Sequence, residues 1–244
     1  MNVDGNKIKK VPFLDSGILL VDKPSEWTSH DVVNFVRRRF NIKKVGHCGT
    51  LDPAATGLLV IVIGRATKLS QKLSGDDKTY TSNMLLGTET DSQDLDGKIT
   101  AENDWIGVTK DQVEKVCKTF VGEQLQTPPM VSAKKVGGKR LYKLAREGKV
   151  IEREPVKINI KSLEINDIEL PYVKFTVSCS KGTYIRTLCY DIGKQLGCGA
   201  VLAGLRRTQC GMFFIEKAVS IDTMKEWEQE ELAESLLWVH NLKI

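Results

Sequence analysis

Strand-like and helix-like segments alternate in this chain of 244 residues without a regular strand–helix–strand repeat. Apolar or alternating patterns predict strands at 18–21, 58–63, 78–87, 156–165, 172–180 and within 205–216. Helical spacing predicts helices at 27–40, 64–73, 109–122, 187–196 and 221–237. Irregular alternation of this kind favours an α+β fold with mixed, mainly antiparallel pairing over a doubly wound parallel sheet.

The composition is that of an ordinary soluble globular protein, with 41% hydrophobic and 27% charged residues. Its longest apolar run, Leu58–Ile63, is far too short to cross a membrane and is typical of a buried strand. The first fifteen residues lack the apolar core of a secretory signal. Six cysteines show no C-x-x-C pair and no histidine at zinc-ligand spacing, which predicts reduced thiols in a cytoplasmic protein without a metal site.

Positive charge is concentrated in one segment, residues 134–153. It holds eight Lys or Arg and two Glu, a net of +6, which leaves the rest of the chain at −1 of the total +5. Interrupted by Gly137-Gly138, the segment is interpreted as a loop that leads into a short amphipathic helix. A localised basic element of this kind indicates docking of a polyanion, and the alternative is a solvated helix face.

The acidic segment DSQDLDGKI, residues 91–99, is similar to a calcium-binding loop at first sight. Aligning Gly97 with the sixth position of an EF-hand places Ser92 at the first position and Asn103 at the twelfth. An EF-hand requires Asp and a bidentate Glu at those positions. The segment is therefore interpreted as an acidic turn rather than a calcium site.

The stretch GHCGTLDPAATG, residues 46–57, contains a single acid, Asp52, among small residues. Taken alone, Asp followed by Pro is typical of a turn or a helix cap. The surrounding glycines and alanines, however, clear side chains from around the acid, and the apolar strand that follows would hold the loop on a rigid element.

A lone carboxylate limits the chemistry that this loop can carry out. Ordinary glycoside hydrolysis needs a second acid to protonate the leaving group. A lone acid can act as nucleophile or base where the leaving group departs without help. Uracil is such a group, because its N1 anion spreads charge onto two carbonyl oxygens.

Several separate motifs resemble the TruB family of tRNA pseudouridine synthases. In chain order they are GILLVDKPSEWTSHDVV, GHCGTLDPAATGLL, KTY at 78–80, SKGTYIRTL at 180–188 and LRR at 205–207. The stretch at 127–148 also resembles the RNA-gripping thumb insertion of that family. Five motifs in the family's order make an accidental match implausible.

The resemblance implies a pseudouridine synthase fold with a central cleft flanked by helices, and a cofactor-free isomerase. The enzyme would convert uridine 55, in the T-loop of tRNA, to pseudouridine after flipping the base out of the loop. Asp52 matches the family's catalytic aspartate. The sequence leaves open whether Asp52 attacks the ribose, attacks the base or removes a C2′ proton.

The same resemblance assigns roles to six further residues. Tyr80 would stack on the flipped base and help remove its C5 proton, and Arg186 would pair with Asp52 and hold its pKa low. Four residues would bind or support the substrate: His47, Tyr184, Leu205 and Lys23. Without the resemblance, Tyr80 and Leu205 would be interpreted as core residues and Arg186 as a surface residue.

The basic segment then becomes a candidate RNA interface, because tRNA binding requires phosphate neutralisation. The candidate phosphate contacts are Lys134, Lys135, Lys139, Arg140, Lys143 and Arg146. We expect a monomer that binds the T-arm of tRNA without a guide RNA.

The predicted organisation is a flexible tail at 1–15, a catalytic domain at 16–217 with its thumb at about 124–153, and a short helix and tail at 218–244. A full C-terminal PUA module, which many bacterial members carry, is not expected. Two alternatives remain: a catalytically silent RNA-binding or tRNA-folding protein, and a guide-RNA-dependent synthase of the box H/ACA type.

Overall fold

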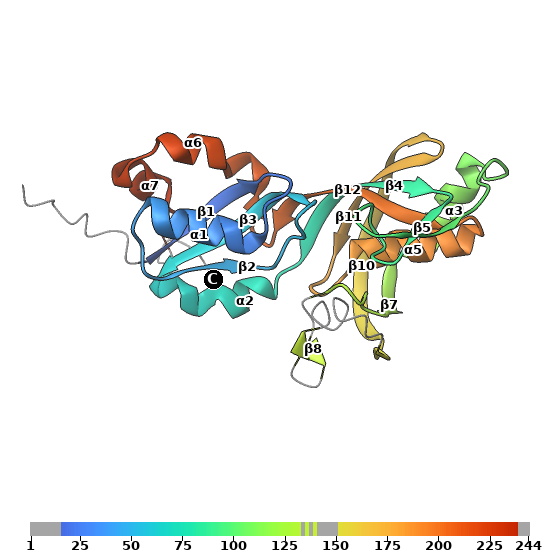
Figure 1. The fold of residues 1–244 in the computed structure, drawn as a ribbon, viewed down its shortest axis with the longest axis horizontal. Helices are drawn as coiled ribbons and strands as arrows, with labels where there is room; N and C mark the ends of the chain where they lie inside the picture. Colours follow the sequence, from blue (N-terminus) through green and yellow to red (C-terminus); the bar gives the residue numbers. More distant parts are fainter. Residues whose placement is uncertain (1–15, 133–134, 137–138, 141–150, 239–244) are drawn as a thin grey trace, which may run out of the picture. The chain divides into compact units, whose positions relative to one another are not determined.

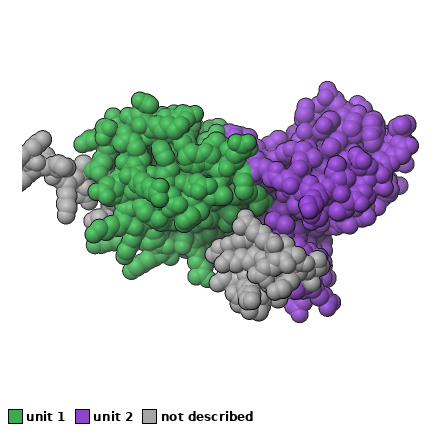
Figure 2. Space-filling model, in the orientation of Figure 1, with its two compact units in different colours: residues 1–53, 57–74, 213–244 green, residues 54–56, 75–212 purple. Residues whose placement is uncertain are grey.

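A computed structural model describes residues 16–132, 135–136, 139–140 and 151–238 (Figure 1). Within 133–150 it describes the backbone only. The chain divides into two compact units, coloured separately in Figure 2. Unit 1 contains the chain up to Pro53, Gly57–Ser74 and the chain from Phe213 onward, and unit 2 contains Ala54–Thr56 and Gly75–Met212. The first crossing from unit 1 to unit 2 therefore follows Pro53 directly.

Unit 1 is a small sheet with helices. Its strands are β1 (Ser16–Lys23), β2 (Val45–Cys48), β3 (Thr56–Gly64), β13 (Phe213–Phe214) and β14 (Val219–Ser220). Its helices are α1 (Ser29–Arg39), η1 (Arg65–Leu69), α2 (Ser70–Ser74), η2 (Ile215–Lys217), α6 (Ile221–Glu226) and α7 (Gln229–Ser235). Strand β1 pairs with β14 in parallel and with β3 in antiparallel fashion, and β2 pairs antiparallel with β3.

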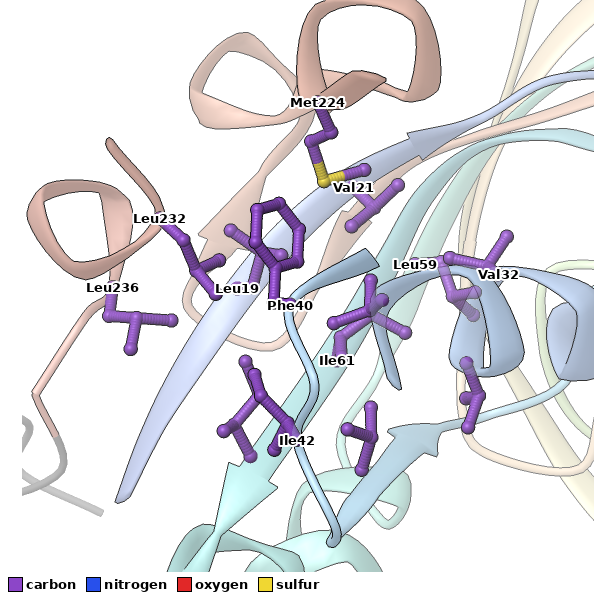
Figure 3. Packing of buried hydrophobic residues seen from close by; sticks show 14 of the residues in the cluster. Leu19, Val21, Val32, Phe40, Ile42, Leu59, Ile61, Met224, Leu232 and Leu236 are labelled. Atoms are coloured by element: carbon purple, nitrogen blue, oxygen red, sulfur yellow. The ribbon is translucent and has the colours of Figure 1, made fainter. Parts of the chain in front are cut away.

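The core of unit 1 forms where one face of this sheet meets α1, α6 and α7. Alternate residues of the strands, such as Leu19 on β1 and Ile61 on β3, meet Val32 of α1 and Met224 of α6 (Figure 3). All four side chains are at most 1% exposed. Truncating Ile61 to Ala would cost about 2–5 kcal/mol, because the packed neighbours cannot fill the space it leaves.

Helix α1 begins at a reciprocal cap. The Thr28 hydroxyl accepts from the Asp31 amide at 3.0 Å, and the Asp31 carboxylate accepts from the Thr28 amide at 2.9 Å. The capping residue is Thr28, because its hydroxyl reaches the third helical residue. Ser29 is thereby left for a different task in the functional loop.

Unit 2 is dominated by an antiparallel sheet in the order β12–β4–β11–β10–β7. The five strands are β4 (Lys78–Leu86), β7 (Gly122–Gln126), β10 (Val156–Glu169), β11 (Tyr172–Cys179) and β12 (Ala200–Cys210). The remaining elements are β5 (Thr88–Thr90), β6 (Ile99–Glu102), α3 (Lys110–Thr119), β8 (Lys135–Val136), β9 (Lys139–Arg140) and α5 (Ile185–Leu196).

The predicted α+β class with mixed, mainly antiparallel pairing is confirmed, since β1 and β14 pair in parallel and the other strand pairs described above are antiparallel. The C-terminal helix differs from its prediction. The helix expected at 221–237 is two helices, because Trp227 and Glu228 adopt extended backbone between them. Glu228 and Glu231 form a new capping box there, which starts α7.

Candidate active site

Lys23, at the end of β1, is completely buried, which is rare for a lysine. Its ammonium donates to three backbone carbonyl oxygens: that of Pro24 at 2.7 Å, of Trp27 at 2.6 Å and of Pro53 at 3.0 Å. Three charge-assisted bonds match the three donors of an ammonium group. Lys23 therefore joins the end of β1 to the residue that follows Asp52.

Ser29 fixes the other side of the same loop. Its hydroxyl accepts from the Leu51 amide at 2.8 Å and lies 3.1 Å from the Leu51 carbonyl oxygen, to which it donates. Both Ser29 and Leu51 are buried, so water does not compete for these bonds. The first turn of α1 thus holds the residue that precedes Asp52.

Asp52 is therefore flanked by two residues that are each bound by a buried side chain. Leu51 is buried, Asp52 is partly exposed and Pro53 is exposed, so the loop rises to the surface at the acid. The Pro53 carbonyl also accepts from the Glu26 amide at 2.9 Å. This arrangement gives a partly solvent-accessible carboxylate on a backbone with little freedom, as a reactive group requires.

His47 lies on β2 rather than in a loop, because β2 extends to Cys48 and pairs with β3. The loop predicted around Asp52 therefore begins after Cys48. His47 is partly buried and opposite Ile61 in the pairing, while Cys48 is completely buried. Gly49, with φ of 84°, then turns the chain out of the strand, in a backbone region that side chains disfavour.

In unit 2, Tyr184 and Arg186 occupy the start of α5, with Tyr184 as its N-cap. The buried side chain of Gln126 holds Tyr184 by both backbone groups: it accepts from the amide at 2.8 Å and donates to the carbonyl at 3.1 Å. These two bonds fix the backbone at the start of the helix from β7. Arg186 follows two residues later and is 3% exposed.

Arg186 is bound by three groups within unit 2. It forms an ion pair with Asp94 (Nη1–Oδ2 3.2 Å) and donates to the carbonyl oxygens of Ser92 at 2.9 Å and Val131 at 2.8 Å. The acidic turn at 91–97 thus contributes a partly buried partner that the sequence did not single out. A guanidinium fixed by a carboxylate and two carbonyls has one orientation. The predicted pairing of Arg186 with Asp52 stays a prediction.

Tyr80 and Leu205 lie on neighbouring strands of unit 2. Tyr80 of β4 is 8% exposed, and Leu205 of β12 pairs with Ser82, two residues further along β4. Burial raises the pKa of Tyr80 to about 12, and the charge of Arg207 and its hydrogen bond to the phenol act in the opposite direction. Arg207 is itself buried, and it is a second polar partner that sequence reasoning missed.

The candidate RNA contacts of the thumb are described only in part. Strands β8 and β9 form a short hairpin in which Lys135 pairs with Arg140. Lys139 lies on β9, whereas Lys134, Lys143 and Arg146 lie outside the described residues, as does the expected amphipathic helix. The backbone hairpin is consistent with a protruding element, and the phosphate contacts stay predictions.

The described residues contain no group of three or more His, Cys, Asp or Glu side chains that could hold a metal ion. Among the helices that the structure describes, none has the length and apolar character needed to span a membrane.

Comparison with known proteins places two family models along the chain. "TruB family pseudouridylate synthase (N terminal domain)" matches residues 37–185, and "tRNA pseudouridylate synthase B C-terminal domain" matches residues 186–240. The tRNA pseudouridine synthase B of Opitutus terrae is 46% identical over 92% of this chain and 93% of its own length. That of Geotalea uraniireducens is 50% identical over 84% of this chain and 66% of its own length.

Solved structures give a matching fold. A chain in the crystal structure of a Cbf5-Nop10-Gar1 complex aligns with a TM-score of 0.74 at 28% identity. The alignment covers 93% of this chain and 61% of that one. An H/ACA RNP bound to a substrate RNA containing 2′-deoxyuridine aligns with a TM-score of 0.67, also at 28% identity, over 88% of this chain and 54% of that one.

Proposed function

The chain belongs to the TruB family of tRNA pseudouridine synthases, and we propose that it converts uridine 55 in the T-loop of tRNA to pseudouridine with Asp52 as the nucleophile. The observation that carries the role of Asp52 is the pinning of both its neighbours. Ser29 holds Leu51 and Lys23 holds Pro53, while the acid between them keeps contact with solvent.

The proposed reaction balances without a cofactor. Asp52 adds to C1′ as the C1′–N1 bond of the flipped uridine breaks, the uracil turns, and C5 displaces the carboxylate so that a C1′–C5 bond forms and Asp52 is regenerated. The C5 proton is lost and N1 gains one, so every other atom of the uridine stays in the product. The rigid loop reduces the entropy lost when the carboxylate meets the nucleoside, which is a large part of what positioning contributes to catalysis.

The residues of unit 2 are proposed to act on the base and on the electrostatics of the reaction. Tyr80 stacks on the flipped uracil and assists loss of the C5 proton, and Tyr184 and Leu205 line the nucleotide. Arg186 supplies a positive charge whose orientation is fixed by Asp94. Asp94→Asn is therefore expected to slow turnover, because Arg186 loses its carboxylate partner. The two carbonyl contacts should still keep the side chain of Arg186 near its position.

Release of tritium from tRNA that carries 5-tritiated uridine tests the reaction. We expect wild-type enzyme to release one tritium per tRNA and Asp52→Asn to lose at least about 10⁴-fold in rate, as removal of a nucleophile does elsewhere. Asp222→Asn, whose side chain is 88% exposed on α6, is the matched control and should keep the wild-type rate. An Asp52→Asn enzyme with a tenth of the wild-type rate would rule out the proposed role.

The tRNA position and the need for a guide are tested separately. Chemical mapping of pseudouridine after reaction should find it at position 55 alone, and a U55C tRNA should release no tritium. A bare T-arm stem-loop should be a substrate without added RNA or protein. Reaction only in the presence of a guide RNA would favour the activity of the H/ACA type, to whose structures the fold is also similar.

A further inference from the structure

One face of β4 in unit 2 carries buried polar groups that the proposed reaction does not yet use. Lys78, Tyr80 and Ser82 point to the same side of the strand and are 6%, 8% and 3% exposed. Arg207 of the adjacent strand β12 is 1% exposed. Burial of two cations beside a phenol is costly, so this arrangement calls for a function beyond packing.

The strand register puts Arg207 directly beside Tyr80. The two residues are opposite partners in the antiparallel pairing of β12 with β4. Side chains at such positions lie on one face with Cβ atoms about 4.5–5.5 Å apart. An irregularity in β12 between Arg207 and Gln209 adds a residue there, and bulges of this kind redirect a side chain.

Arg207 is the cation that the pairing of β12 with β4 places opposite Tyr80, and its charge acts on the pKa of the phenol. On its second side Tyr80 faces Val177 of β11, which is completely buried and apolar. The Lys78 ammonium is directed to the Asp76 carbonyl oxygen at 2.5 Å. Two buried thiols, Cys179 and Cys210, flank Lys78 from β11 and β12.

We propose that Arg207 is a positioning residue for Tyr80, which fixes the orientation of the phenol and stabilises its phenolate form. The phenol proton leaves to solvent, and the phenolate then takes up the C5 proton and returns to the neutral phenol. This inference rests on the proposed function, since it assigns Arg207 to the step in which Tyr80 acts. The guanidinium donates to the phenol oxygen, and its charge opposes the effect of burial, which by itself disfavours a phenolate. The role is distinct from that of Arg186, which is bound to Asp94.

The test is a double-mutant cycle measured by single-turnover tritium release at saturating tRNA. We expect Arg207→Gln to slow the reaction by about 100-fold, within the range of proton-transfer contributions, and to change KM by less than about threefold. Arg207→Lys, which keeps the charge, should recover at least about a tenth of the wild-type rate. In a Tyr80→Phe background, Arg207→Gln should slow the reaction by less than about a further threefold, because the phenol oxygen on which Arg207 acts is gone.

A purely structural role for Arg207 gives a different result. Arg207→Gln would then slow the Tyr80→Phe enzyme and the wild-type enzyme by the same factor, and that outcome would overturn the proposal. A wild-type rate for Arg207→Gln would overturn it too. Lys174→Gln, on the exposed side of β11 and 52% exposed in its side chain, is the control for loss of a cation from the same sheet and should be unchanged.

Arg207 is so deeply buried that its variants could fail to fold, so a second measurement uses a milder change. Tyr80→Phe removes one hydroxyl and should lower the melting temperature more than Tyr172→Phe does, because a buried guanidinium loses one of its partners. Equal melting temperatures would refute the contact. An inactive wild type or an active Asp52→Asn would instead refute the proposed function, so the two failures are distinguishable.

Discussion

Replacement of Lys23 by Met is the most informative test of how the functional loop is held. The methylenes of the lysine are replaced by a side chain of similar volume, but three carbonyl oxygens lose their ammonium donor. The Pro53 oxygen keeps the Glu26 amide, so the Pro24 and Trp27 oxygens carry the larger loss. A buried acceptor left without a donor costs about 1–3 kcal/mol, which gives about 2–6 kcal/mol for these two. Removal of the buried charge offsets part of this, so we expect a net loss of about 3 kcal/mol.

For a chain of this size, a loss of about 3 kcal/mol lowers the melting temperature by about 6–12 °C. The assay is thermal unfolding followed by circular dichroism, with Lys44→Met as the control because Lys44 is exposed. A second readout is the single-turnover rate below the melting temperature. Because Pro53 loses a tether and Asp52 precedes it, the rate should fall even at saturating tRNA. A Lys23→Met enzyme that melts within about 2 °C of wild type would show that the three bonds of Lys23 do not contribute this stability.

Three further predictions concern stability, RNA binding and reactivity. Burial raises the pKa of Asp191 to about 6, so its carboxylate opposes folding above that pH and not below about pH 4. Asp191→Asn should therefore raise the melting temperature at pH 7.5, with the gain absent at pH 4, and an equal gain at both would contradict this sign. Lys139→Gln with Arg140→Gln should reduce the slope of log Kd for tRNA against log salt by about two, measured by filter binding, and an unchanged slope would count against thumb contacts. All six cysteines are buried, so the native enzyme should react with a disulfide reagent far more slowly than the denatured enzyme, and fast labelling of native protein would be the contrary result.

Local patterns predicted most of the secondary structure. Helix α3 begins after Thr109, whose hydroxyl and Gln112 form a capping box, and the alternation at 78–87 is strand β4. These signals depend on residues two to four positions apart, so a single sequence contains them. The break at Trp227 was missed because the 221–237 segment has helical spacing on both sides of it, and the competing cap at Glu228 is equally local.

The partners of the site residues were not predictable in the same way. Asp94 and Arg186 are 92 positions apart, and Arg207 reaches Tyr80 through strand pairing across 127 positions. Nothing local distinguishes Asp94 from the other acids of its turn. The family resemblance singled out Lys23 and Arg186, but which groups they bind depends on tertiary contacts that the motifs do not encode.

Buried cations offer a criterion that works without the resemblance. Four Lys or Arg side chains are buried in the described part of the chain: Lys23, Lys78, Arg186 and Arg207. Each of the four lies in one of the motifs quoted from the sequence, although only two of them had been assigned a role. A buried charge without a function can be replaced by an apolar residue at little cost in stability. A buried charge with a function is retained although it lowers stability. The location of Arg207 and Lys78 beside Tyr80 is therefore evidence for a catalytic role of the β4 face. Lys78→Met should lower the single-turnover rate at a temperature at which the variant is still folded.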